Sequence, residues 1–287
     1  MTTTAARWLV LASAVLFSTG GAAIKTGAFT GAQVSAFRSG IAAIMLSIYL
    51  VAVRGGRLHI SLALLPAGIL YAATLTLFVA ANKLTTAANA IFLQAVAPLY
   101  ILLLGPSVLG ERWTSRDLAH VGALAFGLAL CFAGQEPPTV SAPDPATGNL
   151  LAVLSSVAWA GTLLFLRHFG KSEADDTAGL GAVIVGNAMA AAVAIPFAWP
   201  PPSAPAVAWA TLVYLGVFQI GLAYVFFIRA ITRVSALEAS LLLLIEPVLN
   251  PLWTWLVHGE SPGAYTLVGG AVIVSATALR AATAPRG

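Results

Sequence analysis

Charged residues are scarce in this sequence. Asp, Glu, Lys and Arg together account for 8% of its 287 residues, whereas 59% are hydrophobic. A soluble domain carries roughly 25% charged residues, so this chain has too few to build a water-exposed surface. The mean hydropathy of +0.92 agrees with that conclusion. The composition therefore predicts an all-α integral membrane protein whose surface is covered mostly by lipid.

Residues that form metal, redox or catalytic sites are equally few. The single cysteine, Cys131, lies in an apolar run and excludes a disulfide framework or a Cys-rich metal centre. No Gly-x-Ser-x-Gly, His-Glu-x-x-His or phosphate-binding Gly-rich motif occurs, which argues against an intramembrane enzyme and against ATP-driven transport. The basic residues are scattered without a cluster, which argues against nucleic-acid binding. We expect no enzymatic activity, no cofactor and no metal.

Apolar stretches of about 20 residues, the length that crosses a bilayer, recur along the whole chain. Charged or Pro/Gly-rich points divide them into ten predicted spans: 7–24, 33–53, 61–81, 87–108, 117–134, 148–167, 178–199, 206–228, 236–257 and 263–281. Connections are short, and the longest polar piece lies between the fifth and sixth spans. We therefore divide the chain into a first five-helix unit (1–134), a linker (135–147) and a second five-helix unit (148–287).

Basic residues predict the orientation of these spans, because cytoplasmic loops of membrane proteins carry an excess of Lys and Arg. With the N-terminus inside, the other side of the membrane keeps only Lys25, Arg38 and Lys83 of the 14 basic residues. Both termini are therefore predicted to be cytoplasmic.

The two units share an internal repeat. Pro98 corresponds to Pro247, and Gly110-Glu111 corresponds to Gly259-Glu260, all at an offset of 149 residues. Earlier in each unit, three matches share an offset of 142: Ser13 with Ser155, Phe17 with Trp159, and Lys25 with Arg167. Because each unit has an odd number of spans, the second unit enters the membrane from the opposite face. Inverted repeats of this kind are typical of secondary transporters, with a substrate site at the repeat interface.

This layout resembles the drug/metabolite transporter superfamily, and within it the EamA-type exporters. The resemblance covers nearly the whole chain and is carried by the ten spans and by the Pro98 to Glu111 and Pro247 to Glu260 segments. It implies an exporter of amino acids or other small metabolites in the bacterial inner membrane, most similar to exporters of aromatic amino acids. The resemblance leaves open whether the protein is a monomer or a dimer.

Glu246 is the most conspicuous candidate site residue, because it lies near the middle of the ninth span and directly precedes Pro247. An acidic group within a membrane span is a candidate functional site by default. It could carry a proton or attract the ammonium group of an amino acid. It could instead be a protonated side chain that bonds to a neighbouring helix. No second deep carboxylate is present to form a proton relay, which favours facilitated diffusion over proton coupling.

Other polar residues within the spans are candidates for the walls of a central cavity or for bonds between helices. They lie on spans one, three, four, six and eight: Ser18, Tyr71, Thr74, Asn89, Gln94, Trp159, Thr162, Gln219 and Tyr224. Pro98 and Pro247 each free a backbone carbonyl one turn earlier and are candidate gating kinks.

Basic residues near span ends are expected to extend to the membrane interface. These are Lys25, Arg38, Lys83, Arg229 and Arg280, of which Arg38 could also pair with the other unit. With no cation expected at the centre of any span, exchange of sugar phosphates is disfavoured. The leading function is export of amino acids or similar metabolites by alternating access, in contact with lipid and a small-molecule substrate. Proton-coupled export of drugs or lipophilic cations is the alternative, and an intramembrane enzyme is the remote one.

Overall fold

The computed structural model describes residues 2–55, 65–109, 115–134, 137–169, 176–231, 233–234, 239 and 242–282. Within these ranges every regular element is helical. Eight described segments are long and apolar enough to cross a membrane, and Ala264–Arg280 is a shorter apolar helix. The all-α membrane architecture predicted from the sequence is therefore confirmed.

The helices of the first half occupy the first five predicted spans. Their bounds are α1 (Thr3–Ser18), α2 (Gly20–Ile24), α3 (Gly31–Ile48) with the π-helical η1 (Tyr49–Val53), α4 (Leu65–Leu84), α5 (Ala87–Gln94), α6 (Ala97–Leu109) and α7 (Ser115–Ala133). Polar capping residues determine where several of these helices begin. Thr30 and Gln33 form a reciprocal capping box at α3, and Thr86 accepts from the Asn89 amide at the start of α5.

The helices of the second half occupy the remaining spans. Their bounds are α8 (Pro145–Phe169), α9 (Asp176–Ala198), α10 (Ala206–Tyr214), the π-helical η3 (Leu215–Leu222), α11 (Ala223–Ile231), α13 (Ile245–His258) and α14 (Ala264–Ala282). Helix α8 begins within the predicted linker, because Pro145 suits a first helical turn and Asp144 accepts from the Thr147 amide.

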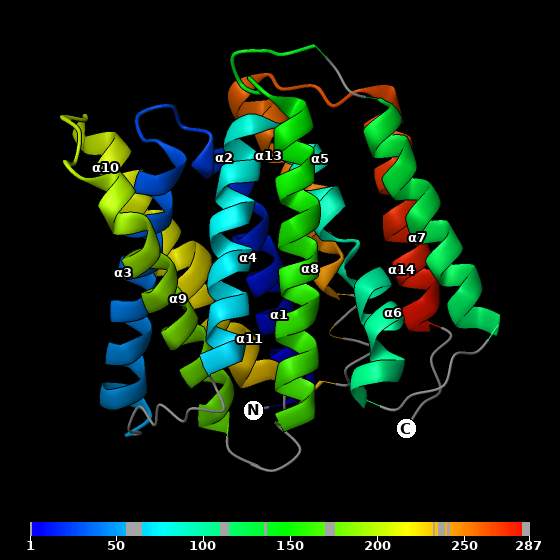
Figure 1. The fold of residues 1–287 in the computed structure, drawn as a ribbon. Coiled ribbons are helices and arrows are strands. Elements are labelled where there is room, and N and C mark those ends of the chain that lie inside the picture. The colour runs from blue at the N-terminus through cyan, green and yellow to red at the C-terminus, as the bar shows by residue number, and fades with distance from the viewer. Residues whose placement is uncertain are drawn as a thin grey trace.

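The outward faces of these helices are apolar. Ile44, Val193, Leu256 and Leu279 each expose more than half of their surface. Apolar exposure on this scale is unfavourable in water, and a lipid bilayer removes the penalty. The ends of α1 and α14 that carry the chain termini lie on the same side of the bundle, as an even number of crossings requires (Figure 1).

Helices of the two halves pack against one another rather than forming two separate bundles. Helix α4 lies along α8, α3 along α9, and α1 along α11 (Figure 1). Two hydrogen bonds across this interface are equivalent under the sequence offsets of the repeat. The Ser13 hydroxyl donates to the Ala223 carbonyl at 2.9 Å, and the Ser155 hydroxyl donates to the Thr74 carbonyl at 3.0 Å.

Each repeat contains a helix break three residues before its proline. Ala95, with ψ of −7°, separates α5 from α6 ahead of Pro98. Leu244, at the same offset of 149, has ψ of −12° ahead of Pro247 and is where α13 begins. Proline cannot donate to the carbonyl four residues earlier, which for Pro98 is that of Gln94. The Ser156 hydroxyl donates to that carbonyl at 3.0 Å and so satisfies it from α8.

Candidate substrate cavity

A cavity of about 350 Å³ lies between the two halves. The predicted spans one, three, four, six, eight and nine all contribute to its walls, and spans two and ten contribute through Arg38 and Thr277. Its lining is mostly apolar with a few polar groups, the usual character of a small-molecule site. Seven of the predicted site residues line it, together with both prolines: Tyr71, Thr74, Gln94, Trp159, Gln219, Tyr224, Glu246, Pro98 and Pro247.

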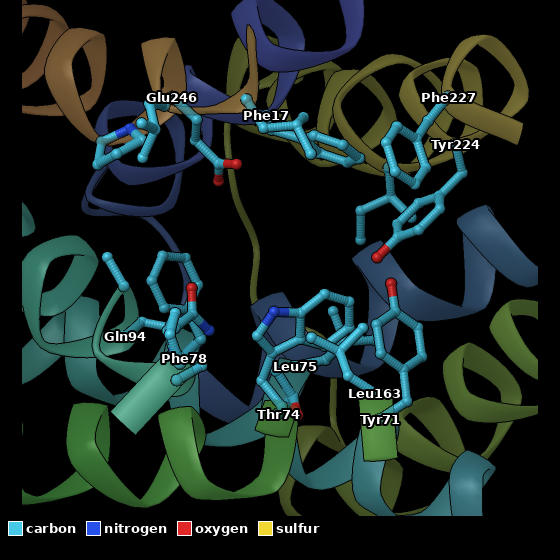
Figure 2. A pocket seen from close by; sticks show the side chains of 18 of the residues that line it. Phe17, Tyr71, Thr74, Leu75, Phe78, Gln94, Leu163, Tyr224, Phe227 and Glu246 are labelled. Carbon is cyan, nitrogen blue, oxygen red and sulfur yellow. The ribbon is translucent and has the colours of Figure 1, made fainter. Parts of the chain in front are cut away.

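Glu246 projects its carboxyl group into this space from the first turn of α13 (Figure 2). The helix break at Leu244 places it at a helix start, where backbone N–H groups favour negative charge. Among the described residues, no basic side chain forms an ion pair with it. The group is half-buried and accessible from the cavity, and it is therefore available to a cationic or hydrogen-bonding ligand.

Two aromatic pairs line the cavity, and each pair joins the two halves. Phe17 meets Tyr224 edge to face at 5.1 Å between ring centroids, and Trp159 meets Tyr71 at 6.0 Å. The Tyr71 and Tyr224 hydroxyls point toward each other (Figure 2). These walls offer flat apolar surface and aromatic faces to a bound side chain.

Polar wall residues are held by hydrogen bonds, either to a neighbouring helix or to the backbone of their own helix. The Gln94 amide donates to the Ser155 hydroxyl at 2.8 Å, and the Thr74 hydroxyl donates to the Leu70 carbonyl at 2.9 Å. Gln219 lies on the wide π-helical turn of η3. The Oε1 atom of its side-chain amide is buried without a hydrogen-bond partner among the described residues. This oxygen is a second free polar group at the cavity.

Three predicted site residues do not line the cavity. The Ser18 hydroxyl accepts from the Trp253 indole at 2.9 Å, and Asn89 accepts from the Thr266 hydroxyl at 2.8 Å. The Thr162 hydroxyl donates to the Ala158 carbonyl of its own helix at 2.9 Å. Ser18 and Asn89 thus bond to other helices, the alternative that the sequence had left open for them, whereas Thr162 bonds within its own helix.

Arg38 is the cavity residue whose place the sequence analysis predicted wrongly. It was expected to extend to the membrane interface, but it is 1% exposed and lines the cavity. Its Nε and Nη2 atoms have no hydrogen-bond partner among the described residues. Arg38 is the eighth residue of α3, about 10 Å along the helix from its start at a rise of about 1.5 Å per residue. That depth, with Ser35 about one turn before it and Ser39 next to it in the sequence, was the available signal.

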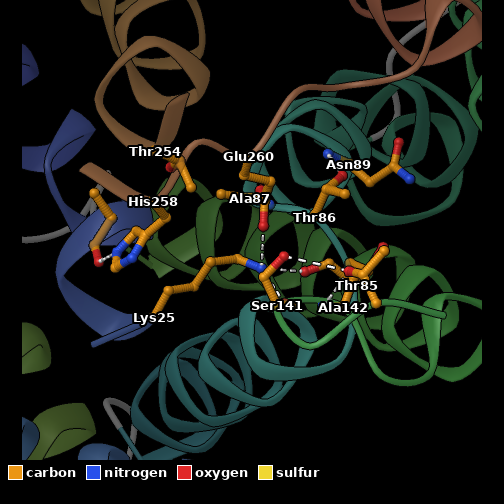
Figure 3. Close-up of polar contacts among 12 residues, drawn as sticks. Lys25, Thr85, Thr86, Ala87, Asn89, Ser141, Ala142, Thr254, His258 and Glu260 are labelled. Atoms are coloured by element: carbon orange, nitrogen blue, oxygen red, sulfur yellow. Dashed lines mark hydrogen bonds and ion pairs between the residues drawn. The ribbon is translucent and has the colours of Figure 1, made fainter. Parts of the chain in front are cut away.

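A buried ion pair (Figure 3) lies beside α2, at the end of the bundle away from the termini (Figure 1). Lys25, just after α2, approaches Glu260 at 2.6 Å, and both side chains are 4% exposed. Lys25 also donates to the Thr85 and Ser141 carbonyls at 2.8 and 2.5 Å, and Glu260 accepts from the Ala87 amide at 2.6 Å. Burial lowers the pKa of the Lys25 ammonium, and the adjacent carboxylate opposes part of that change. Lys25 was expected at the interface, and this expectation was wrong as well.

This polar cluster joins the two halves, because Lys25 and Ala87 belong to the first and Glu260 to the second. A ring nitrogen of His258 lies 2.8 Å from the Ala22 carbonyl and adds a further link. Glu111 and Arg167, the repeat equivalents of Glu260 and Lys25, lie outside the residues whose side chains are described. Within the described part of the chain, no three His, Cys, Asp or Glu side chains gather into a metal site.

Comparison with known proteins shows two matches to the EamA-like transporter family, over residues 4–133 and 146–281. Two curated relatives are the pseudopaline exporter CntI of Pseudomonas aeruginosa strains UCBPP-PA14 and PAO1. Each is 28% identical over 276 residues, which cover 93% of this chain and 93% of the relative. A solved crystal structure of a protein at 23% identity has the same fold, with a TM-score of 0.65 and coverage of 98% of this chain and 96% of that one.

Proposed function

We propose that this chain, which belongs to the EamA-like transporter family, exports amino acids or metabolites with amino-acid chemistry across the bacterial inner membrane. Family membership makes it a membrane transporter, and its relatives are exporters of a small metabolite. The observation that carries the proposal is the carboxyl group of Glu246 in a cavity with aromatic walls. A carboxylate without an ion-pair partner can bind an ammonium group, and the aromatic walls can bind an apolar side chain.

The size of the cavity supports a small substrate. A volume of about 350 Å³ lies near the lower end of the range of about 300–1,000 Å³ for ligand pockets. Because few fixed polar groups line it, selectivity among side chains is expected to be broad. Recognition is expected to depend mainly on the charged end of the substrate rather than on its side chain.

Alternating access is the mechanism that we propose for this site. The Lys25–Glu260 ion pair ties the halves together at the end of the bundle away from the termini, which is the predicted extracytoplasmic end. Its rupture would open the cavity on that side. The helix breaks before Pro98 and Pro247 lie in the cavity wall and give each repeat a point at which to bend. The two family matches and the reciprocal serine contacts support an inverted repeat as the basis of this motion.

Transport of lipophilic cations is the competing proposal, and it rests on the same two features. An acid group next to aromatic faces also attracts cations without a carboxylate. The two proposals differ in whether the protein carries amino acids or only cations that lack a carboxylate. Flux measurements on the same protein distinguish them.

The test is uptake of labelled Trp, Phe, Met and Thr into proteoliposomes, with and without an imposed pH gradient. We expect saturable uptake that Glu246→Gln abolishes or strongly reduces. Asp144→Asn is the matched control, because Asp144 is exposed and Asn retains the ability to cap a helix. Uptake that requires the gradient and is lost in Glu246→Gln would make Glu246 the proton carrier. Folded protein that carries none of these amino acids but carries lipophilic cations would refute the proposal.

A further inference from the structure

The geometry points to Arg38 as the group that binds the carboxylate of the substrate, so that the transported compounds are carboxylates, chiefly zwitterions, rather than simple cations. This inference rests on the proposed function in that it gives the substrate chemistry of the same cavity. Nothing in the sequence had assigned Arg38 a role there.

Arg38 is a buried cation with unused donors. The residue is 1% exposed, it lines the cavity, and its Nε and Nη2 atoms lack hydrogen-bond partners among the described residues. Leaving a buried charged donor unsatisfied costs free energy, and a charge without a counter-ion costs more. A site of this kind is completed by an anion, and the planar guanidinium fork fits a carboxylate through two parallel hydrogen bonds.

The charges around Arg38 leave it available to a ligand. The hydroxyls of Tyr71 and Tyr224 act on it electrostatically, and neither is a carboxylate. Among the described residues that line the cavity, Glu246 is the only acidic one, and no described ion pair joins it to Arg38. The described lining therefore contains one positive and one negative side chain that do not neutralise each other.

A zwitterion satisfies both charges at once. Its carboxylate would bind Arg38 and its ammonium group would bind Glu246, with the side chain against the aromatic walls. A doubly charged phosphate would be repelled by Glu246, and a simple cation would leave Arg38 without an anion. Arg38 supplies a buried cation within a span, so anionic groups on a substrate are no longer disfavoured on the ground that such a cation is missing.

The test is binding of matched ligand sets to the purified full-length protein by calorimetry. Each set comprises an amino acid, its N-acetyl derivative and its amide, for Trp, Phe, Met and Thr. The N-acetyl compound keeps the carboxylate and loses the ammonium group, whereas the amide does the reverse. We expect Arg38→Met to weaken binding of the amino acid and the N-acetyl compound by roughly ten- to a hundredfold, and to leave the amide unchanged. Glu246→Gln should weaken the amino acid and the amide, and spare the N-acetyl compound.

Two further variants protect the result against a folding artefact. Arg38→Lys keeps the charge without the planar fork and should bind with intermediate affinity. Arg229→Met is the matched control, because Arg229 is exposed and does not line the cavity, and it should change nothing. The binding affinities of the ligands of one set can also be compared in the parent protein, and this comparison requires no variant.

The outcomes separate this inference from the proposed function. If the amides bind as tightly as the amino acids in every set, or if the N-acetyl compounds keep their affinity in Arg38→Met, the role of Arg38 is refuted. If carboxylates bind through Arg38 but proteoliposomes carry no amino acid, the inference stands and the proposed amino acid export fails. If amino acids are carried without any dependence on Arg38, the proposed function stands alone.

Discussion

Removal of the Glu260 carboxylate should open the cavity on the predicted extracytoplasmic side. In Glu260→Gln, the buried Lys25 ammonium loses its counter-ion but keeps the Thr85 and Ser141 carbonyls. Breaking a buried ion pair costs about 3–5 kcal/mol when no partner remains. Since two carbonyl acceptors and a neutral amide do remain, we expect about 2 kcal/mol. At about 1.4 kcal/mol per tenfold, the equilibrium would shift roughly thirtyfold toward the state that is open on that side.

Cysteine accessibility can measure this shift. The native Cys131 is fully buried, so it should give little background. A cysteine introduced at Leu75, in the cavity wall, would be labelled by a membrane-impermeant maleimide applied to spheroplasts (Figure 2). Glu260→Gln should label about ten- to thirtyfold faster than the parent, because the rate follows the population of the open state.

Two controls make the result specific. Asp117→Asn breaks a second described ion pair, with Arg280, in which the arginine side chain is 33% exposed, and should leave the labelling rate unchanged. Adding Lys25→Met to Glu260→Gln removes the uncompensated charge and should restore part of the closure. An unchanged rate in a folded Glu260→Gln protein would refute the reasoning that this ion pair closes the cavity.

Three further predictions concern the repeat and the cavity wall. Ser156→Ala should lower the free energy of unfolding by about 1–3 kcal/mol, because it leaves the freed Gln94 carbonyl unpaired, whereas the exposed Ser107→Ala should have no effect in the same thermal unfolding assay. Pro98→Ala restores a backbone donor at the helix break, so we expect slower transport in proteoliposomes without a lower melting temperature; transport at the parent rate would argue against a gating role. Gly186→Ala should destabilise the protein by about 1–3 kcal/mol and weaken substrate binding, because a Cβ there would overlap the Cδ1 atom of the Tyr71 ring, and unchanged calorimetric affinity would contradict this.

Sequence alone determined the features that depend on composition along the chain. The number and approximate position of the spans follow from apolar length, since every crossing must satisfy its backbone within one helix. Pro98 and Pro247 marked the helix breaks because proline lacks a donor wherever it stands. Glu246 stood out as a site candidate because acidic residues are rare in spans, and the structure places it at the cavity.

Only the tertiary structure decided which way each polar side chain points. In a membrane protein both the lipid-facing and the buried sides of a helix are apolar, so periodicity gives little indication of the inner face. Asn89 and Thr162 therefore looked equivalent to Gln94 in the sequence but bond to other helices or to their own backbone. Arg38 and Lys25 looked like interfacial cations, because sequence position gives depth along one helix and not the helices packed around it. One of them lies in the central cavity and the other in a buried ion pair with Glu260, more than 200 residues away in the chain.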